Sequence, residues 1–297
     1  MEISFDASNA HLNGNAEASY GGQTSIGFEH GYWIGKACHN SYVLEDKLNT
    51  PVGIINVTLG TENINNQEAT WYVTDSSTID SLTLNNGGHL SFAAPEQGLD
   101  IFQSFNDGYH SVTTSKFQGN NGVLSLRIDM AQDSIGNLAN DQLIITQHAS
   151  GKQIANIIFE GDKLSSDKPY SENWLVYQAD SDTNGLSFRN FDGTNKYSGN
   201  GMLTTYSLLF TKDENIDSDT KWEETGNGKG YWHLVQIGTT PGGSDESGQS
   251  TPAEAQQIQN LGSSVAQAVG WLSEKNDLRR RLGEVRYGSQ AGAWAKA

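Results

Sequence analysis

Residues 71–92 read Trp71-Tyr72-Val73-Thr74-Asp75-Ser76-Ser77-Thr78-Ile79-Asp80-Ser81-Leu82-Thr83-Leu84-Asn85-Asn86-Gly87-Gly88-His89-Leu90-Ser91-Phe92, and this stretch decides the fold. Apolar and polar residues alternate in it over two short strands that recur at a spacing of roughly ten residues, with a Gly-Gly turn between them. This spacing predicts stacked coils of a β-solenoid, in which each coil buries its apolar face against its neighbours. Because no strict sequence period is visible, a β-sandwich also fits the pattern.

Further strand candidates lie on both sides of this stretch. Short ones, at 42–44 and 53–59, precede it between Asn-Gly, Gly-Gly and Asp-Ser turn signals, so we expect residues 1–100 to form solenoid coils. The chain then has longer candidates at 122–128, 141–146, 155–159, 174–177, 203–210 and 230–235. A solenoid exposes its last coil as an edge that needs protection against aggregation, so we predict that residues 101–240 cap it.

The last part of the chain has a different pattern. We predict a flexible polar linker at 241–250 and a helix over 251–286, which starts with Thr251 at the cap and Pro252 in the first turn. A helix of about 30 residues is about 45 Å long, enough to pass through a pore that spans a bilayer. The segment is too polar to face lipid, and residues 287–297 look like the start of a β-strand.

Composition and charge limit the functional classes. The chain has 297 residues, 33 Gly, 5 Pro and a net charge of −17, which fits one or two domains rich in strands and turns. The excess of acid opposes binding to phosphates, so we exclude nucleic acid as a partner. Cys38 is the single cysteine and cannot form an intramolecular disulfide.

Export signals and membrane spans are not apparent. No apolar run reaches the roughly 18 residues of a transmembrane helix. The start, Met1-Glu2-Ile3-Ser4-Phe5-Asp6, lacks the basic and apolar regions of a signal peptide. If the protein is exported, we expect this sequence to be an internal fragment.

No residue pattern predicts a metal, a cofactor or an enzyme. His30 and His39 lie near Cys38, but a third ligand at a suitable spacing is missing. The many carboxylates could pair for glycoside hydrolysis, yet most lie in turn-like contexts where they cap their own backbone. Asp192-Gly193-Thr194-Asn195 resembles only the start of a calcium loop, so we predict a turn there. A nucleophile elbow and a phosphate-binding loop are also absent from the sequence.

Two further features have alternative interpretations. The aromatic residues of the strands either fill the core and cover its edge or stack on sugars, and we favour the core; they are Trp71, Trp174, Trp222, Tyr231 and Trp232. Asn276-Asp277 is a candidate for self-cleavage, because an Asn amide can attack its own backbone carbonyl and close a succinimide. Within a helix, however, an Asn is usually an ordinary surface residue.

Four motifs together resemble the C-terminal passenger region of type Va bacterial autotransporters. Asp141-Gln142-Leu143-Ile144-Ile145-Thr146, followed by Ala149-Ser150-Gly151, resembles the Asp-x-Leu-x-Val-x-Gly-x-Ala-x-Gly pattern of the pertactin-like autochaperone. Gly230-Tyr231-Trp232-His233-Leu234 resembles its closing Gly-x-Trp-x-Leu. Arg281-Leu282-Gly283-Glu284-Val285-Arg286 resembles the Arg-Leu-Gly-Glu-Leu-Arg linker motif, and Gly292-Ala293-Trp294-Ala295-Lys296 resembles the opening of the first barrel strand.

The resemblance implies a pertactin-like, right-handed parallel β-helix with a C-terminal capping or autochaperone domain, followed by a linker helix. It implies a folding nucleus around Trp174, Tyr231, Trp232 and Leu234. The expected partners are the protein's own translocator β-barrel and the outer-membrane assembly machinery, with host surfaces or glycans as further candidates. The expected state is a monomer, secreted or held at the bacterial surface in association with the outer membrane.

Two alternatives accompany this interpretation. In serine-protease-type autotransporters the linker is cut between two Asn residues, and Asn276-Asp277 keeps the first of them but replaces the second. We therefore expect such cleavage, if any, only in the full-length protein. The alternative function is a surface adhesin or a carbohydrate-binding or carbohydrate-active β-helix domain.

Overall fold

The computed structural model describes residues 2–7, 10–19, 21–40, 53–61, 68–95, 108–129, 140–160, 174–198, 204–212 and 221–239. These residues are all-β and their pairing is mostly parallel, which confirms the predicted all-β class. Within them, no helix has the length and hydropathy needed to cross a membrane. Residues 1–238 form one compact unit, which therefore includes the described parts of 1–100 and those of 101–240 up to Gly238.

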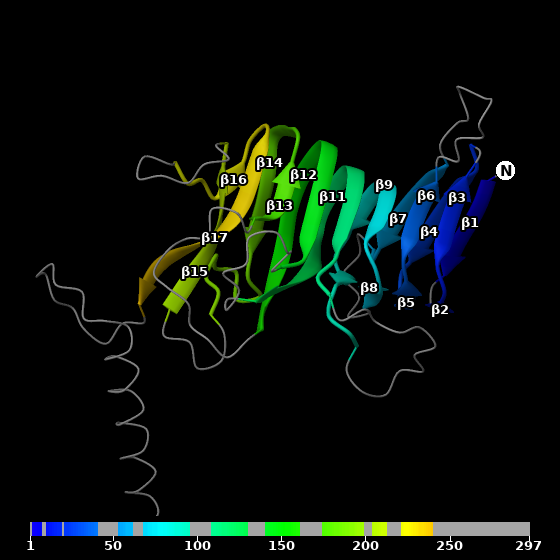
Figure 1. Cartoon of the computed structure of the whole chain (residues 1–297), viewed down its shortest axis with the longest axis horizontal. Coiled ribbons are helices and arrows are strands. Elements are labelled where there is room, and N and C mark those ends of the chain that lie inside the picture. Colours follow the sequence, from blue (N-terminus) through cyan, green and yellow to red (C-terminus); the bar gives the residue numbers. More distant parts are fainter. Residues whose placement is uncertain are drawn as a thin grey trace, which may run out of the picture. The chain divides into compact units, whose positions relative to one another are not determined.

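Figure 1 shows the strands, of which β1 to β12 follow one another in chain order along this unit, and labels all of them except β10. They are β1 (Glu2–Ala7), β2 (Ala10–Asn13), β3 (Ala16–Ser19), β4 (Gln23–Phe28), β5 (Gly31–Gly35), β6 (Ala37–Asn40), β7 (Ile54–Leu59), β8 (Ala69–Val73), β9 (Ser77–Leu84), β10 (Gly88–Ser91), β11 (Ser111–Asp129), β12 (Gln142–Glu160), β13 (Trp174–Gln178), β14 (Ser181–Arg189), β15 (Thr204–Thr211), β16 (Thr225–Gly226) and β17 (Gly230–Thr239).

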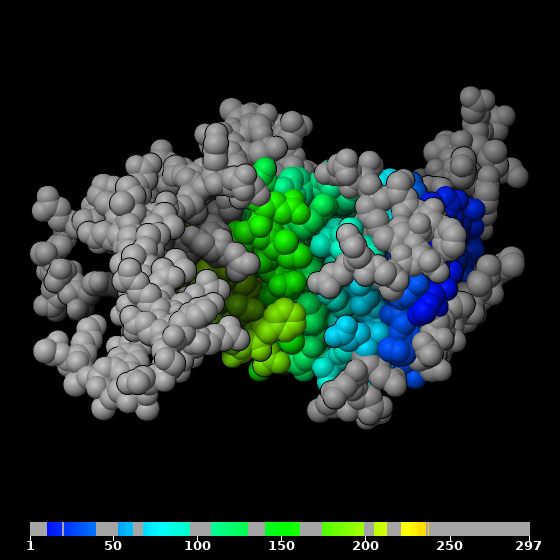
Figure 2. All heavy atoms as spheres, turned by 90° about the horizontal axis from the view of Figure 1, so that it is seen from below, coloured from blue at the N-terminus to red at the C-terminus, as the bar shows by residue number. Residues whose placement is uncertain are grey.

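The strands pair in three parallel rows that the chain visits in turn. The first row contains β1, β4, β7, the end of β9 and the middle of β11 and β12. The second contains β2, β5, β8, β10 and the end of β11 and β12. The third begins with β3, β6 and the start of β9 and continues through β11, β12 and β13. In Figure 2 the surface colour changes from blue through cyan to green, so successive parts of the sequence lie next to one another along this unit.

The distance in sequence between paired strands varies along the rows. Glu2 pairs with Gln23, 21 residues later, whereas Ser111 pairs with Gln142, 31 residues later. The connections between strands therefore differ in length, which explains why the sequence shows no strict period.

Two predicted strands are in fact parts of one strand. We expected separate strands at 141–146 and 155–159, but β12 runs without a break through both. It can do so because Gly151 adopts a φ of 95° within the strand, a conformation that glycine tolerates and other residues rarely adopt. A Cβ at Gly151 would also overlap the carbonyl oxygen of Gly119, its partner in β11, so the two strands approach each other closely at this pair of glycines.

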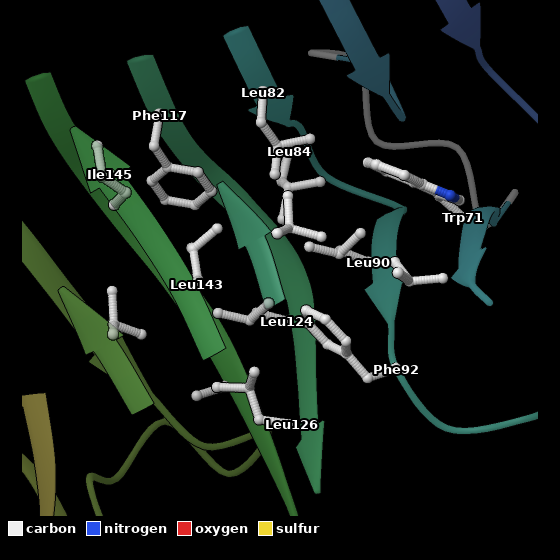
Figure 3. Packing of buried hydrophobic residues seen from close by; sticks show 14 of the residues in the cluster. Trp71, Leu82, Leu84, Leu90, Phe92, Phe117, Leu124, Leu126, Leu143 and Ile145 are labelled. Carbon is white, nitrogen blue, oxygen red and sulfur yellow. The ribbon is translucent and has the colours of Figure 1, made fainter. Parts of the chain in front are cut away.

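Apolar side chains from successive strands form columns inside the rows. One column in the second row consists of Leu12, Trp33, Trp71, Leu90 and Leu124. The Trp33 and Trp71 rings stack with centroids 4.4 Å apart, and the Trp71 indole donates a 2.9 Å hydrogen bond to the Gly35 carbonyl. Figure 3 shows leucines of β9 to β12, together with Phe117 of β11 and Phe92 just after β10, pointing into the same interior. The core is therefore continuous along the rows.

Parallel pairing ends at β13 and β14. Strand β17 pairs antiparallel with β13, and β16 pairs antiparallel with β14. Strand β15 pairs with β17, and Phe210 in β15 forms an isolated antiparallel bridge with Glu223. The unit thus ends in a group of antiparallel strands, β13 to β17, which we call the antiparallel end.

Four predicted segments lie outside the described residues: the strand at 42–44, the linker at 241–250, the helix at 251–286 and the strand start at 287–297. They stay predictions.

Candidate functional site

Trp232 is the centre of the antiparallel end. Its side chain is fully buried, and its indole N–H donates a 3.0 Å hydrogen bond to the side-chain oxygen of Gln178 in β13. The Phe188 ring meets it edge to face at 4.8 Å, and the Phe210 ring lies 5.5 Å away. Three strands, β14, β15 and β17, therefore contribute aromatic rings to one buried cluster.

Gln178 connects this cluster to the turn before β17. Its amide nitrogen donates hydrogen bonds of 2.9 Å to the Gly226 carbonyl and 2.8 Å to the Gly228 carbonyl. Its oxygen accepts the bond from Trp232, so both ends of a fully buried amide are satisfied. Such a network favours one arrangement of the strands, because any other arrangement would leave buried polar groups unpaired.

The spacing Gly230-x-Trp232-x-Leu234 has a direct structural reason. Side chains alternate between the two faces of a strand, so these three positions share the inner face of β17. Trp232 is fully buried there and Leu234 is 8% exposed. A Cβ at Gly230 would overlap the Thr211 carbonyl oxygen and the Phe210 ring, so only glycine fits at this position.

Trp174 and Tyr231 lie together on the other face of the same pair of strands. Their ring centroids are 5.5 Å apart, and Tyr177 is 5.0 Å from Tyr231. The structure therefore brings Trp174, Tyr231, Trp232 and Leu234 to one strand pair, with Trp174 and Tyr231 half-buried and Trp232 and Leu234 buried.

This outer cluster does not form a flat platform for sugar rings. The planes of Trp174, Tyr177 and Tyr231 are tilted by 45° to 59° from one another, so the rings pack against each other. Tilted packing of this kind is a common way for aromatic pairs to stabilise a fold.

Sequence reasoning missed an ion pair between Arg127 and Asp141. Asp141 is fully buried, and its carboxylate accepts four hydrogen bonds of 2.9–3.0 Å: one from the His110 backbone N–H, and three from the backbone N–H, Nε and Nη2 of Arg127. The Arg127 Nη2 also donates a 2.8 Å bond to the Gly108 carbonyl. A lone Arg within an apolar strand was the signal in the sequence, because such a charge needs a partner.

Charge and burial affect the groups around this pair. Burial disfavours the charged form of Arg127, but the hydrogen bond and attraction of Asp141 outweigh it and raise the pKa of Arg127. Burial, with the nearby Glu160 carboxylate, also raises the pKa of Tyr109, whose hydroxyl donates a 3.0 Å bond to Glu160. Arg127 is therefore charged and Tyr109 protonated at neutral pH.

His89 and Ser125 resemble part of a hydrolase site, but they are not placed to act as one. The His89 Nε2 lies 2.7 Å from the Ser125 hydroxyl, which also accepts a 3.0 Å bond from Asn156. Ser125 is 1% exposed, so a substrate does not reach its oxygen. Burial lowers the pKa of His89 to about 4, which keeps the imidazole neutral.

Metal-ligating residues do not gather within the described part of the chain, where no group of three or more His, Cys, Asp or Glu residues is placed to hold an ion. His39 instead contacts Asp80, with Nδ1 and Oδ2 3.2 Å apart. The segment Asp192-Gly193-Thr194-Asn195 forms a turn in which Asp192 accepts bonds from the Thr194 N–H and hydroxyl, at 2.8 and 2.7 Å.

The other predicted site residues lie outside the described residues. These are the cleavage candidates Asn276 and Asp277 and the linker motif Arg281, Leu282, Gly283, Glu284 and Arg286. No protein-family model matches the sequence, and no curated protein matches it.

Proposed function

We propose that this chain is the C-terminal passenger segment of a type Va autotransporter. In this proposal, residues 101–240 cap and nucleate a right-handed parallel β-helix during secretion across the outer membrane. The observation that carries the proposal is the change from parallel to antiparallel pairing at β13 and β14, around the buried Trp232.

The three rows of strands support the β-helix part of the proposal. The chain passes from the first row to the second and third, and then returns to the first beside its earlier strand. Connections between parallel strands are almost always right-handed, because a right-twisted strand packs back onto its sheet only in that sense. A chain that repeats such a connection winds into a right-handed coil.

The antiparallel end has the properties of a cap. The last parallel strand of a stack exposes a row of unpaired N–H and C=O groups that can pair with another chain. Strand β17 occupies this edge of β13, and β16 occupies the edge of β14 at Leu186 and Ser187. Strands added in the opposite direction end the parallel stack and so protect it against further growth.

The same strands have the properties of a folding nucleus. Trp232, Phe210 and Leu234 are buried there, and each large apolar side chain contributes about 1.5–3 kcal/mol when fully buried. Strands β13 to β17 lie within 66 residues of sequence, from Trp174 to Thr239. The proposal that this group folds before the rows rests on this buried cluster and not on local pairing, because β13 and β17 pair residues that are 52 to 59 positions apart, whereas Glu2 and Gln23 in the first row are 21 apart.

The location and partners in the proposal come from the resemblance of the later motifs. The linker motif that starts at Arg281 and the strand motif that starts at Gly292 are similar to segments that, in autotransporters, enter the translocator barrel. On that basis we propose a bacterial cell-surface protein whose partners are its own barrel and the outer-membrane assembly machinery.

Secretion of the full-length protein tests the proposal. We expect deletion of residues 101–240, and the smaller change Trp232→Ala, to reduce protease-resistant passenger at the cell surface. Phe191→Ala is the matched control, since Phe191 is 63% exposed and removal of its ring leaves the Trp232 cluster intact. Normal amounts of folded surface passenger without residues 101–240 would contradict the proposal.

A further inference from the structure

The Arg127–Asp141 pair connects three separate points of the chain. Asp141 directly precedes β12, Arg127 lies near the end of β11, and His110 directly precedes β11. All three meet at one carboxylate, which His110 and Arg127 contact at 2.9–3.0 Å. The pair therefore relates the start of β12 to both the start and the end of β11, the strand that pairs with it.

The apolar alternation of β11 and β12 does not by itself specify one register, and the pair acts beside two other register-dependent contacts, the Asn156–Ser125 hydrogen bond and the close approach of Gly151 to Gly119. Both strands have 19 residues, and their register shifts between Thr114 and Lys116 and between Asn120 and Val123. A slip of one residue would turn the apolar side chains outward, but a slip of two would preserve the alternation. Leu124 would then face Ile157 in place of Ala155, which is equally apolar.

A slip of two residues has a severe effect on the Arg127–Asp141 pair. It would move Asp141 by about 6–7 Å relative to the backbone N–H of His110, beyond hydrogen-bond distance. Asp141 is fully buried and the Arg127 side chain is 13% exposed, so the slip would leave a buried charge with too few partners. A buried charge without a partner is strongly unfavourable, whereas the pair itself contributes little net stability compared with apolar residues of similar size.

We propose that the Arg127–Asp141 pair fixes the register of β11 against β12 and contributes little to net stability. Arg127 and Asp141 are thus positioning residues for the long strands that lead into the antiparallel end. The inference goes beyond the proposed function, since it holds for this fold whatever the route of secretion.

Cysteine cross-linking in the full chain, with Cys38→Ser, measures the register directly. Lys116 and His148 are partners in the native register, so the pair Lys116→Cys and His148→Cys reports it. The pair Lys116→Cys and Ser150→Cys reports a slip of two residues. With the native ion pair, we expect a short reagent with two thiol-reactive groups, such as a bis-maleimide, to link the first pair about ten times faster than the second, because a slipped strand leaves a buried charge unpaired.

The test variant is the apolar replacement Arg127→Met with Asp141→Leu. We expect it to keep a melting temperature at or above that of the parent, while the two cross-linking rates approach each other. The control is the single change Lys36→Met, which removes an exposed ion pair of 3.5 Å with Asp75; Asp75 itself is kept, because its carboxylate also lies 3.9 Å from the His110 ring. It should leave the ratio of rates unchanged.

Two results would overturn the proposal. One is a folded apolar variant that keeps the tenfold preference, since the register would then be fixed by other contacts. The other is an apolar variant that fails to fold, as judged by circular dichroism, since the pair would then be required for stability itself. The single change Asp141→Asn removes the charge but keeps the shape of the side chain. We expect it to lower the ratio of the two cross-linking rates, although it adds no apolar side chain.

Discussion

Gly230 is the residue where the antiparallel end has least room. We predict that Gly230→Ala destabilises the protein by about 1–3 kcal/mol, because the added methyl group must displace backbone or an aromatic ring. The clash involves the Thr211 carbonyl oxygen and the Phe210 ring. Urea denaturation followed by tryptophan fluorescence measures the change.

Gly108→Ala is the control for this prediction. A Cβ at Gly108 would have its nearest neighbour 4.0 Å away, at the His110 ring, so the change should be close to neutral. Equal losses of stability for the two variants would show that glycine flexibility matters more than the close contacts at Gly230.

His89 gives the protein a specific sensitivity to acid. Burial lowers the pKa of His89 to about 4 from an ordinary value of 6.5, so below pH 6.5 the unfolded chain binds a proton that the folded chain does not. Stability is therefore complete above pH 6.5 and falls as the pH decreases toward 4. We predict that His89 accounts for about 2–3 kcal/mol of lost stability at pH 4.5.

Comparison with His89→Gln isolates this contribution. The variant cannot titrate at this position, whereas carboxylates elsewhere affect both proteins equally. Unfolding free energies at pH 7 and pH 4.5 should therefore differ more for the parent than for the variant. Identical differences in the two proteins would contradict the prediction.

The face of the sheet on which a side chain lies was predictable where it follows from the alternation and size of the residues in a strand. The inward positions of Trp232 and Leu234 follow from the strand pattern, which also places Tyr231 on the opposite face. The contacts of Gln178 with Gly226 and Gly228 were not predictable, because they join residues 48 and 50 positions apart whose proximity depends on the fold. The same applies to the Arg127–Asp141 pair, although an Arg in an apolar strand could have prompted a search for its partner.

At the scale of elements, β17 is the strand that ends the parallel stack at β13. We predict that Tyr231→Pro disrupts it, since proline cannot donate to a sheet and is excluded from paired positions. Tyr231 pairs directly with Tyr177 of β13. Loss of this pairing should expose the edge of β13 and cause concentration-dependent association, measured by light scattering after size-exclusion chromatography.

Phe191→Pro is the matched control. Phe191 is the second residue of a turn in which the Gly193 N–H donates a 3.0 Å bond to the Asn190 carbonyl, a position that proline favours. The variant should stay monomeric. Association of both variants, or of neither, would argue against a protective role for β17.

Element types were predictable, but pairing directions were not. Alternation in residues 71–92 is enough to identify strands, and the structure places three of them there. Whether a strand pairs parallel or antiparallel depends on the route of the chain to its partner, which short-range pattern does not contain. For that reason a β-sandwich fitted the sequence as well, and the change of direction at β13 was visible only in the fold.

At the scale of the whole molecule, we propose that strands β13 to β17 fold before the rows that precede them. Pulsed hydrogen exchange with mass spectrometry, during refolding of the 297-residue chain from urea, measures this order directly. We expect amides of residues 174–189 and 230–239 to gain protection before those of 23–40 and 54–59. Protection of the earlier strands first, or of all strands together, would contradict this proposal.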